Sequence, residues 1–373
     1  MNNNRYRTRI ALIPAALIAL IAGCATTPPP EDTAEQAPVT AVAPTMEPAP
    51  LPAEEVVAAV RPDHPQRYVV QPGDTLWDIS ARFLRDPWFW PEIWSKNPAV
   101  RNPHLIYPGD ILSLVYIDGR PVLQVQRGGD IRLSPKVRIE DIDRAIPTIP
   151  IDAISRFLGS HRVVGEGELE MAPYIVSSVD QRLIAGAGDT IYARGIDVPD
   201  PSWQIVRAGK PYLNPDDPSD ILGYEAIDVG GAALVAAGDP ATLDITRSTR
   251  EALVGDRLMP VGDHRFDENF IPRGPDQPVS GRIVRVIDGL NQIGQYQIVA
   301  LGLGLDAGLE PGHVLAVWQD GPVVRDPVNR EAVKLPDQHA GVVMVFRVFD
   351  RVSYALVMNA TRPMHVLDVI TNP

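Results

Sequence analysis

The sequence predicts a multidomain protein: a small α+β module, followed by predominantly β domains with a weak internal repeat. Three observations lead to this fold class. Residues 67–117 carry the pattern strand, helix, helix, strand. The chain beyond Pro173 has Gly, Asp and Pro turns at short intervals and little helical periodicity. A proline-rich stretch without an apolar period precedes the module.

The module begins with a short strand and a capped helix. Tyr68-Val69-Val70 is β-rich and ends at Pro72-Gly73, which predicts a strand followed by a turn. Thr75 and Asp78 have the spacing of a capping box, in which two side chains serve the first amides of a helix. One face of that helix carries the apolar residues Leu76, Ile79 and Phe83.

A second short helix and a returning strand complete the module. Pro91 suits the first position of a helix. Asn97-Pro98 ends that helix, because the residue before a proline disfavours helical backbone. Residues 111–115 then supply an apolar run that is typical of a strand. The order is therefore βααβ within about fifty residues.

Two motifs in this module match a known family. They are Y-V-V-Q-P-G-D-T-L-W from Tyr68 and N-P-H-L-I-Y-P-G-D-I-L from Asn102. The module resembles a LysM domain, a small domain that binds glycans containing N-acetylglucosamine. The resemblance implies that two loops, residues 73–76 and 105–109, lie side by side and hold the sugar.

Glycan binding requires backbone donors and acceptors in a shallow groove, with apolar contact for the acetamide methyl group. Gly73 and Gly109 are expected to let the backbone approach the ligand closely. The alternative is that both glycines serve only their turns and that Asp74 only caps the helix. The residues expected to bind the glycan are Gly73, Asp74, Thr75, Leu76, Leu105, Ile106, Tyr107, Pro108 and Gly109.

Four of the six tryptophans lie between Trp77 and Trp94. Trp94, with Trp77 as the second candidate, is expected in the core. Trp88 and Trp90 lie in a proline-flanked turn that is more aromatic than so small a domain can bury. They are therefore expected to contact a partner. The alternative is that Trp88 or Trp90 packs on the following domain.

The amino terminus has the pattern of a targeting segment. The basic stretch Arg5–Arg9 precedes an apolar run that is too short to span a membrane. Ile21-Ala22-Gly23-Cys24 resembles a bacterial lipoprotein cleavage site, which implies a signal peptide over residues 1–23 and a lipidated Cys24. Ala25 after the cysteine favours the outer membrane by analogy. The alternative is an ordinary secretory signal with a chance cysteine.

Residues 24–66 are expected to form a lipidated, disordered tether. Ten prolines lie between Ala25 and Pro65, and such a segment cannot bury enough apolar surface to offset its ordering entropy. As a coil it spans roughly 35–40 Å. This reach suits a link between an anchor in the outer membrane and a module in the periplasm.

The net charge of −13 argues against nucleic acid as a partner. Arg67 to Asp110 contains five basic and five acidic residues, so the module is locally neutral, as expected for an uncharged sugar. No enzyme, cofactor or metal is expected, because Cys24 is the sole cysteine and H-E-x-x-H, G-x-S-x-G and S-x-x-K are absent. A carboxylate-pair glycosidase has no sequence signature, so a cell-wall hydrolase stays as an alternative.

Residues 118–172 are expected to form a hairpin and a connector. Asp118-Gly119 between two β runs predicts a two-residue hairpin loop. Residues 152–158 have the pattern of a short amphipathic helix.

Two β units are expected beyond the connector, residues 173–260 and 281–373, joined by a polar linker over 261–280. Gly231–Leu258 is similar to Gly341–Ile370, a weak repeat with a spacing of about 110 residues.

The second unit contains Gly281-Arg282-Ile283-Val284 and a glycine-rich stretch over Gly304–Leu315, and resembles the carboxyl-terminal domain of the flagellar-assembly protein FlgT. A LysM module followed by such a domain resembles the TsaP family of type IV pilus secretin-associated proteins. This resemblance implies peptidoglycan binding next to an outer-membrane secretin. The lipoprotein box departs from the plain secretory signal of that family. The alternative is a general lipoprotein that links the outer membrane to peptidoglycan without a secretin.

Overall fold

The computed structural model describes residues 53–94, 106–126, 145–159, 161–197, 200–261, 270–287 and 293–373. The expected signal peptide, Cys24 and most of the expected tether lie outside these residues, as does Leu105.

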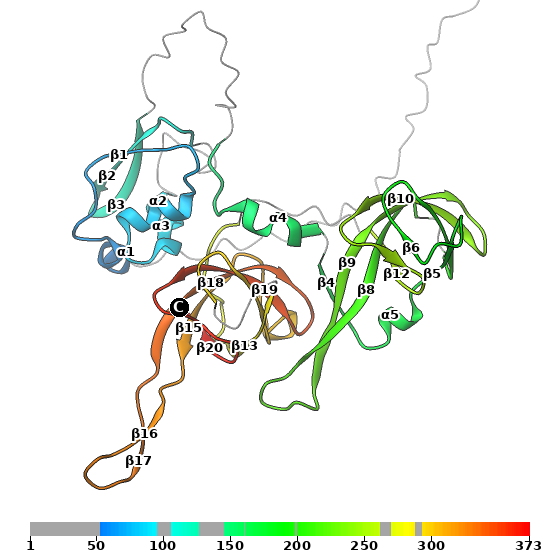
Figure 1. Ribbon diagram of the computed structural model, residues 1–373. Coiled ribbons are helices and arrows are strands. Elements are labelled where there is room, and N and C mark those ends of the chain that lie inside the picture. Colours follow the sequence, from blue (N-terminus) through cyan, green and yellow to red (C-terminus); the bar gives the residue numbers. More distant parts are fainter. Residues whose placement is uncertain are drawn as a thin grey trace, which may run out of the picture. The chain divides into compact units, whose positions relative to one another are not determined.

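The module has the βααβ order that the sequence predicts (Figure 1). A third strand follows through a two-residue loop, because Ile117 pairs with Arg120. Asp118 and Gly119 have φ values of 50° and 78°, and two positive φ angles are what a type I′ hairpin turn requires. The elements are β1 (Tyr68–Val69), α2 (Leu76–Phe83), the 3-10 turn η1 (Pro87–Phe89), α3 (Trp90–Trp94), β2 (Ile111–Ile117) and β3 (Arg120–Gln126), with antiparallel sheet order β1-β2-β3.

The folded module begins earlier than the sequence suggested. Helix α1 (Ala53–Ala59) lies within the segment expected to be tether, yet Val56, Ala59 and Val60 are buried in the same core as Ile79 and Phe83. The tether boundary at residue 66 is therefore wrong. Two valines, Val56 and Val60, are spaced by one helical turn, and that spacing was too short a signal to outweigh the surrounding prolines.

The expected helix of the connector is α4 (Ile151–Gly159). It is preceded by an irregular stretch, Ala145–Pro150, which contains two prolines. The segment after it contains β4 (Arg162–Val164) and α5 (Glu168–Met171).

The first β unit closes into a ring of six strands. Its hydrogen-bonded order is β5-β7-β10-β9-β8-β12, and β12 returns to β5. Strand β4 pairs with β9 beside the ring, and β6 (Ile184–Ala185) pairs with β11 (Ala252–Leu253). The ring strands are β5 (Tyr174–Ser178), β7 (Thr190–Arg194), β8 (Ser202–Leu213), β9 (Ile221–Ala236), β10 (Ala241–Ser248) and β12 (Arg257–Pro260).

The second β unit is a closed barrel of order β13-β14-β19-β18-β15-β20. A hairpin of β16 (Val323–Arg325) and β17 (Ala332–Lys334) extends from it between β15 and β18 (Figure 1). The 3-10 turn η2 covers Leu305–Ala307. The barrel strands are β13 (Ser280–Ile287), β14 (Ile298–Leu301), β15 (Val314–Gln319), β18 (Gln338–Val348), β19 (Ser353–Ala360) and β20 (Val369–Thr371).

The two rings share one strand order. If the six strands of each ring are numbered 1 to 6 along the chain, their order around the ring is 1-2-5-4-3-6, and strand 6 pairs with strand 1. Segments 231–258 and 341–370, for which the sequence predicts a repeat, lie in the fourth, fifth and sixth strands of their respective rings. Asp256 and Asp368 also make the same turn before the sixth strand, since each carboxylate accepts the backbone N–H three residues earlier at 2.8 Å.

The distal ends of β8 and β9 reach the second barrel. The hydroxyls of Tyr212 and Tyr354 lie 3.1 Å apart, and Arg351 pairs with Asp220 at 2.7 Å. The Arg351 guanidinium, helped by the Asn214 amide, lowers the pKa of Asp220 to about 2. These contacts join strands of the first unit to the wall of the second.

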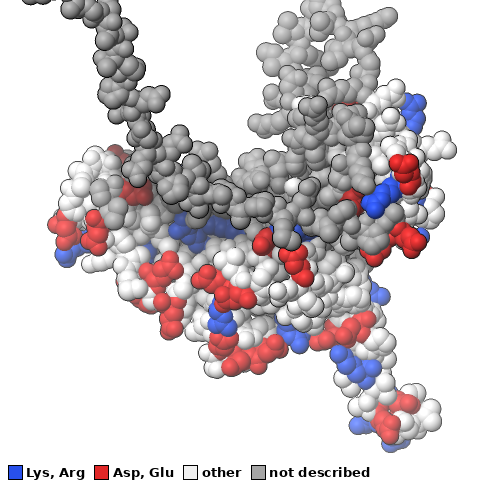
Figure 2. Space-filling model, turned by 180° about the vertical axis from the view of Figure 1, so that it is seen from behind, with Lys and Arg blue, Asp and Glu red and all other residues white. Residues whose placement is uncertain are grey.

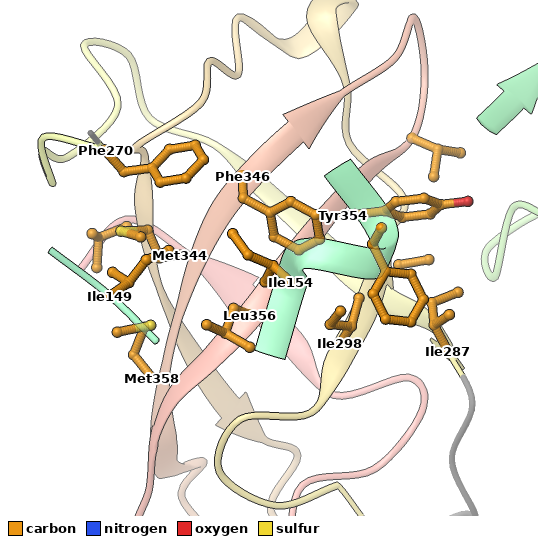
Figure 3. Close-up of a cluster of buried hydrophobic side chains, with 14 of the residues drawn as sticks. Ile149, Ile154, Phe270, Ile287, Ile298, Met344, Phe346, Tyr354, Leu356 and Met358 are labelled. Atoms are coloured by element: carbon orange, nitrogen blue, oxygen red, sulfur yellow. The ribbon is translucent and has the colours of Figure 1, made fainter. Parts of the chain in front are cut away.

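Strands β18 and β19 are buried on both faces. Side chains that point to one face of these strands, such as Val343 and Val357, belong to a cluster to which all six strands contribute, and this cluster fills the barrel. Side chains on the opposite face, such as Met344, Phe346 and Leu356, belong to a second cluster, here called the outer cluster. Figure 3 shows Ile154 of α4 in that cluster, close to Phe346 and Leu356. The connector therefore covers the outside of the barrel.

Within the described residues, no helix is long and apolar enough to cross a membrane. On the face that Figure 2 presents, basic and acidic side chains are interspersed rather than gathered into one broad field.

Candidate functional site

The two loops expected to hold the sugar lie side by side. The backbone N–H of Val70 donates to the carbonyl oxygen of Asp110, and the N–H of Gly109 donates to the carbonyl oxygen of Val70, each at 2.9 Å. The pairing of β1 with β2 leads directly into these two bonds. The sheet thus fixes the spacing of the loops, as the resemblance implied.

Each loop is a tight turn closed by its own aspartate. In Gln71–Asp74, the carboxylate of Asp74 accepts the N–H of Gln71 at 2.7 Å and the Tyr68 hydroxyl at 2.8 Å. In Tyr107–Asp110, the Asp110 carboxylate accepts the N–H of Tyr107 at 3.1 Å. Both bonds tie the end of a turn to its start.

Gly73 and Gly109 are required by the backbone of these turns. Their φ values are 91° and 96°, a conformation that L side chains rarely adopt. A Cβ atom at either position would meet no atom within 4 Å. The glycines therefore serve the turn conformation, and no neighbouring chain atom crowds them.

Thr75, and not Asp74, caps helix α2. The Thr75 hydroxyl oxygen accepts the N–H of Asp78 at 3.1 Å, and its hydrogen is donated to the Asp78 carboxylate at 2.7 Å. Half of the expected capping box is thus present, because the Asp78 carboxylate accepts the Thr75 hydroxyl rather than a backbone amide. The N–H of Ile79 bonds the carbonyl oxygen of Thr75 at 3.0 Å. Thr75 thereby bonds two of the amides of residues 76–79, that of Asp78 through its hydroxyl and that of Ile79 through the first ordinary helix bond.

The other two first-turn amides are bonded to the connector. The N–H of Leu76 donates to the carbonyl oxygen of Pro147 at 3.0 Å, and the N–H of Trp77 donates to that of Thr148 at 3.1 Å. On the opposite loop, the carbonyl oxygen of Ile106 accepts the N–H of Ile146 at 2.8 Å. A segment of the same chain is therefore bonded to both loops.

Sequence reasoning missed this segment. Ile146-Pro147 and Ile149-Pro150 held a usable signal, because a residue before proline is pushed to extended backbone. Two such pairs in a row predict an extended strand without a sheet partner. They do not predict where that strand docks.

The burial of the expected site residues divides them into two groups. Thr75, Leu76 and Ile106 are each at most 4% exposed, so their side chains are closed to a ligand in this structure. Gly73 and Gly109 are exposed, while Asp74, Tyr107 and Pro108 are partly buried.

Trp88 and Trp90, the two tryptophans expected to contact a partner, differ in burial and in the cluster that they contact. Trp90 is 1% exposed and lies in the core of the module with Ile93 and Trp94, so its assignment as a partner contact is wrong. The proline-flanked turn winds into η1 and α3, which rotates Trp90 inward. Trp88 is partly buried, stacks on Phe89 with ring centroids 3.9 Å apart, and packs against the outer cluster. That cluster contains Trp77 of the module as well as residues of the connector and the barrel, so Trp88 is not a free contact surface.

Comparison with protein families gives a match to the LysM domain over residues 68–115. Residues 68–115 form a LysM domain. The match ends within β2, while β3 and α1 of this chain also contribute to the core of the LysM domain.

Two curated proteins are also similar to parts of the chain. One is imidazolonepropionase of Geobacillus thermodenitrificans (strain NG80-2), 28% identical over 152 residues that cover 38% of this chain and 35% of that protein. The other is the uncharacterized protein YqbP of Bacillus subtilis (strain 168), 37% identical over 60 residues that cover 13% of this chain and 27% of that protein. The chain thus spans about a third or less of either relative.

The LysM domain suggests binding of peptidoglycan or another carbohydrate. Its loops present main-chain amides and carbonyls, which suit the acetamide group of an amino sugar. The described side chains at the loop rims, Tyr107 and Pro108, offer apolar contact.

Proposed function

We propose that this protein is a non-catalytic, peptidoglycan-binding component of the cell envelope. The observation that carries the proposal is the LysM domain, with its two loops held together by the bonds between Val70, Gly109 and Asp110. The balance of five basic and five acidic residues between Arg67 and Asp110 supports recognition of uncharged sugar groups rather than peptide carboxylates. Binding should therefore depend little on salt.

Cosedimentation of the full chain with purified peptidoglycan sacculi tests the proposal. We expect the same pelleted fraction at low and at high salt, and release by soluble oligomers of N-acetylglucosamine. Tyr107→Ala removes a side chain at the loop rim and should weaken binding at least fivefold, whereas Tyr116→Ala, on the exposed hairpin of the module, should not. A folded chain that stays in the supernatant at low salt would refute the proposal.

We propose further that Cys24 carries a lipid and that the chain is anchored to the outer membrane on its periplasmic side. The support is the lipoprotein-like stretch Ile21–Cys24 and the proline-rich residues that follow it. A Cys24→Ala variant should lose metabolic labelling with a radioactive fatty acid and should leave the membrane fraction. Labelling that persists in this variant would contradict the assignment.

The partner that we propose for the β units is the secretin of a type IV pilus system. This rests on the resemblance of residues 281–373 to the FlgT carboxyl-terminal domain, and of the whole arrangement to the TsaP family. Crosslinking in cells followed by purification should enrich a secretin with the full chain. A chain truncated after residue 172 should lose that enrichment. If the full chain enriches no secretin, a general link between outer membrane and peptidoglycan becomes the better description.

A further inference from the structure

Residues 146–149, here called the strap, occupy the part of the LysM domain that reads amide groups. The strap offers one N–H, from Ile146, to the carbonyl oxygen of Ile106, and one carbonyl oxygen, from Pro147, to the N–H of Leu76. These two groups belong to different peptide units of the strap, whereas an N-acetyl group carries one N–H and one carbonyl oxygen on a single amide. The strap therefore occupies a backbone acceptor and a backbone donor of the two loops that the amide groups of a ligand could otherwise use.

Three amides in the first turn of α2 are already bonded. The N–H of Asp78 bonds to the Thr75 hydroxyl, while the N–H groups of Leu76 and Trp77 bond to the strap. A sugar that uses the amide of Leu76 or Trp77 must take it from a carbonyl oxygen of the strap.

The strap is held at both ends by apolar side chains. Ile146 is 5% exposed and lies in the core of the LysM domain, whereas Ile149 is fully buried in the outer cluster with Trp77. Pro147 and Pro150 keep the residues before them extended, which lowers the entropy lost when the strap docks. Because the strap is part of the chain, its effective concentration at the groove is on the order of millimolar or higher.

We propose that the strap is an intramolecular ligand that closes the LysM groove, and that a glycan must displace it to bind. This inference rests on the proposed function, because it presumes that the groove binds a glycan. The apparent affinity for glycan is then reduced by the fraction of molecules in which the strap is docked. By reciprocity, a bound glycan releases Ile149 from the outer cluster and so loosens the connector on the barrel.

Calorimetric titration of the full chain with a soluble N-acetylglucosamine pentamer tests the strap. In one variant, Ile146→Gly, Pro147→Ser and Thr148→Gly are combined, which removes the buried anchor Ile146 and the backbone restraint of Pro147. We expect this variant to bind the pentamer at least tenfold more tightly than the natural chain. The matched control combines Asp152→Ala and Ser155→Ala, two exposed positions of α4, and should bind like the natural chain.

Hydrogen exchange on the natural chain gives a second measurement that needs no variant. Without glycan, the amides of Leu76, Trp77 and Ile146 should all be protected. With saturating pentamer, Leu76 should stay protected while exchange at Ile146 accelerates, because Ile146 has left Ile106. Protection at Ile146 that persists when the pentamer is bound would overturn the strap proposal, even if the triple variant fails to fold.

The outcomes separate the strap from the proposed function. If the pentamer and sacculi bind neither the natural chain nor the folded triple variant, glycan binding itself fails, and the strap proposal fails with it. If both bind with equal affinity, glycan binding stands and the strap proposal is wrong. If both proteins bind and the triple variant binds more tightly than the natural chain, the result supports glycan binding and the strap proposal together.

Discussion

The hydroxyl of Tyr296 donates a hydrogen bond of 3.0 Å to Oδ1 of Asp78, whose Oδ2 accepts the hydroxyl of the α2 cap residue Thr75. The two residues are 218 positions apart, and the bond joins the LysM domain to the second barrel unit. Burial, with the charge of Asp78, raises the pKa of Tyr296 to about 12, so the phenol keeps its proton and remains a donor at neutral pH.

A double-mutant cycle measures this bond. Tyr296→Phe removes the donor, and Asp78→Asn removes the charge but keeps an acceptor. Since the site is partly exposed, we expect a coupling free energy of about 0.5–1 kcal/mol in urea unfolding. Tyr116→Phe, whose ring lies in the exposed part of the β2–β3 hairpin, is the control and should change stability by less than about 0.5 kcal/mol. Additive effects of the two substitutions would show that the charge of Asp78 does not strengthen the bond.

Two adjacent valines test whether α1 belongs to the folded module. Val56 is 1% exposed and lies in the module core, whereas Val57 is 40% exposed. Val56→Asp buries an unpaired charge and should lower the free energy of unfolding by about 3 kcal/mol. Val57→Asp should change it by less than about 0.5 kcal/mol. Equal changes in stability at the two positions would show that α1 does not pack in the core of the module.

A pair of glycine substitutions tests the conformation of the site loops. At Gly109, φ is 96° and a Cβ atom would meet open space, so Gly109→Ala should cost about 1 kcal/mol from backbone strain alone. Gly186 also has open space around it but no positive φ. Gly186→Ala should therefore be neutral or stabilise by about 0.5 kcal/mol. Thermal unfolding of both variants provides the comparison, and an unchanged midpoint for Gly109→Ala would contradict the turn assignment.

His313 should make stability fall at mildly acidic pH. Its Nδ1 accepts the N–H of Glu310 at 3.1 Å, and its buried Nε2 has no hydrogen-bond partner among the described residues. Burial, with the charge of Arg273, lowers the pKa of His313 below its usual 6.5. The unfolded chain then binds more protons than the folded chain below about pH 6.5, so the free energy of unfolding falls as pH falls through that range.

Substitution of His313 tests this linkage. In His313→Asn the side chain still offers an acceptor for Glu310 but does not titrate. The loss of stability between pH 7.5 and pH 5.5, measured by urea unfolding, should be smaller in this variant than in the natural chain. His365→Asn, at an exposed histidine, should leave the natural pH dependence unchanged. A pH profile that is identical in all three proteins would exclude His313 as its source.

Local signals explain how far the sequence could predict the fold. The Thr75 cap of α2, the Asp118-Gly119 hairpin and the LysM motifs each involve residues close together in the chain, and each is present in the structure. The tether boundary failed because α1 is stabilised by contacts with Phe83 and its neighbours and not by its own sequence pattern. The prediction that Trp90 contacts a partner failed for a related reason, since the winding of the aromatic turn decides which ring faces inward.

The sequence by itself determined the LysM module, its two loops and the β character of the remainder, because these follow from turn residues and short-range periodicity. Only the tertiary structure decided that the connector lies between the loops. An extended stretch such as Ile146–Ile149 does not satisfy its own backbone N–H and C=O groups, so they need partners elsewhere in the chain. Sequence periodicity does not say where those partners lie. The amides of Leu76 and Trp77 found their partners some seventy residues along the chain. That choice depends on the α4 docking that brings Ile149 to the barrel wall.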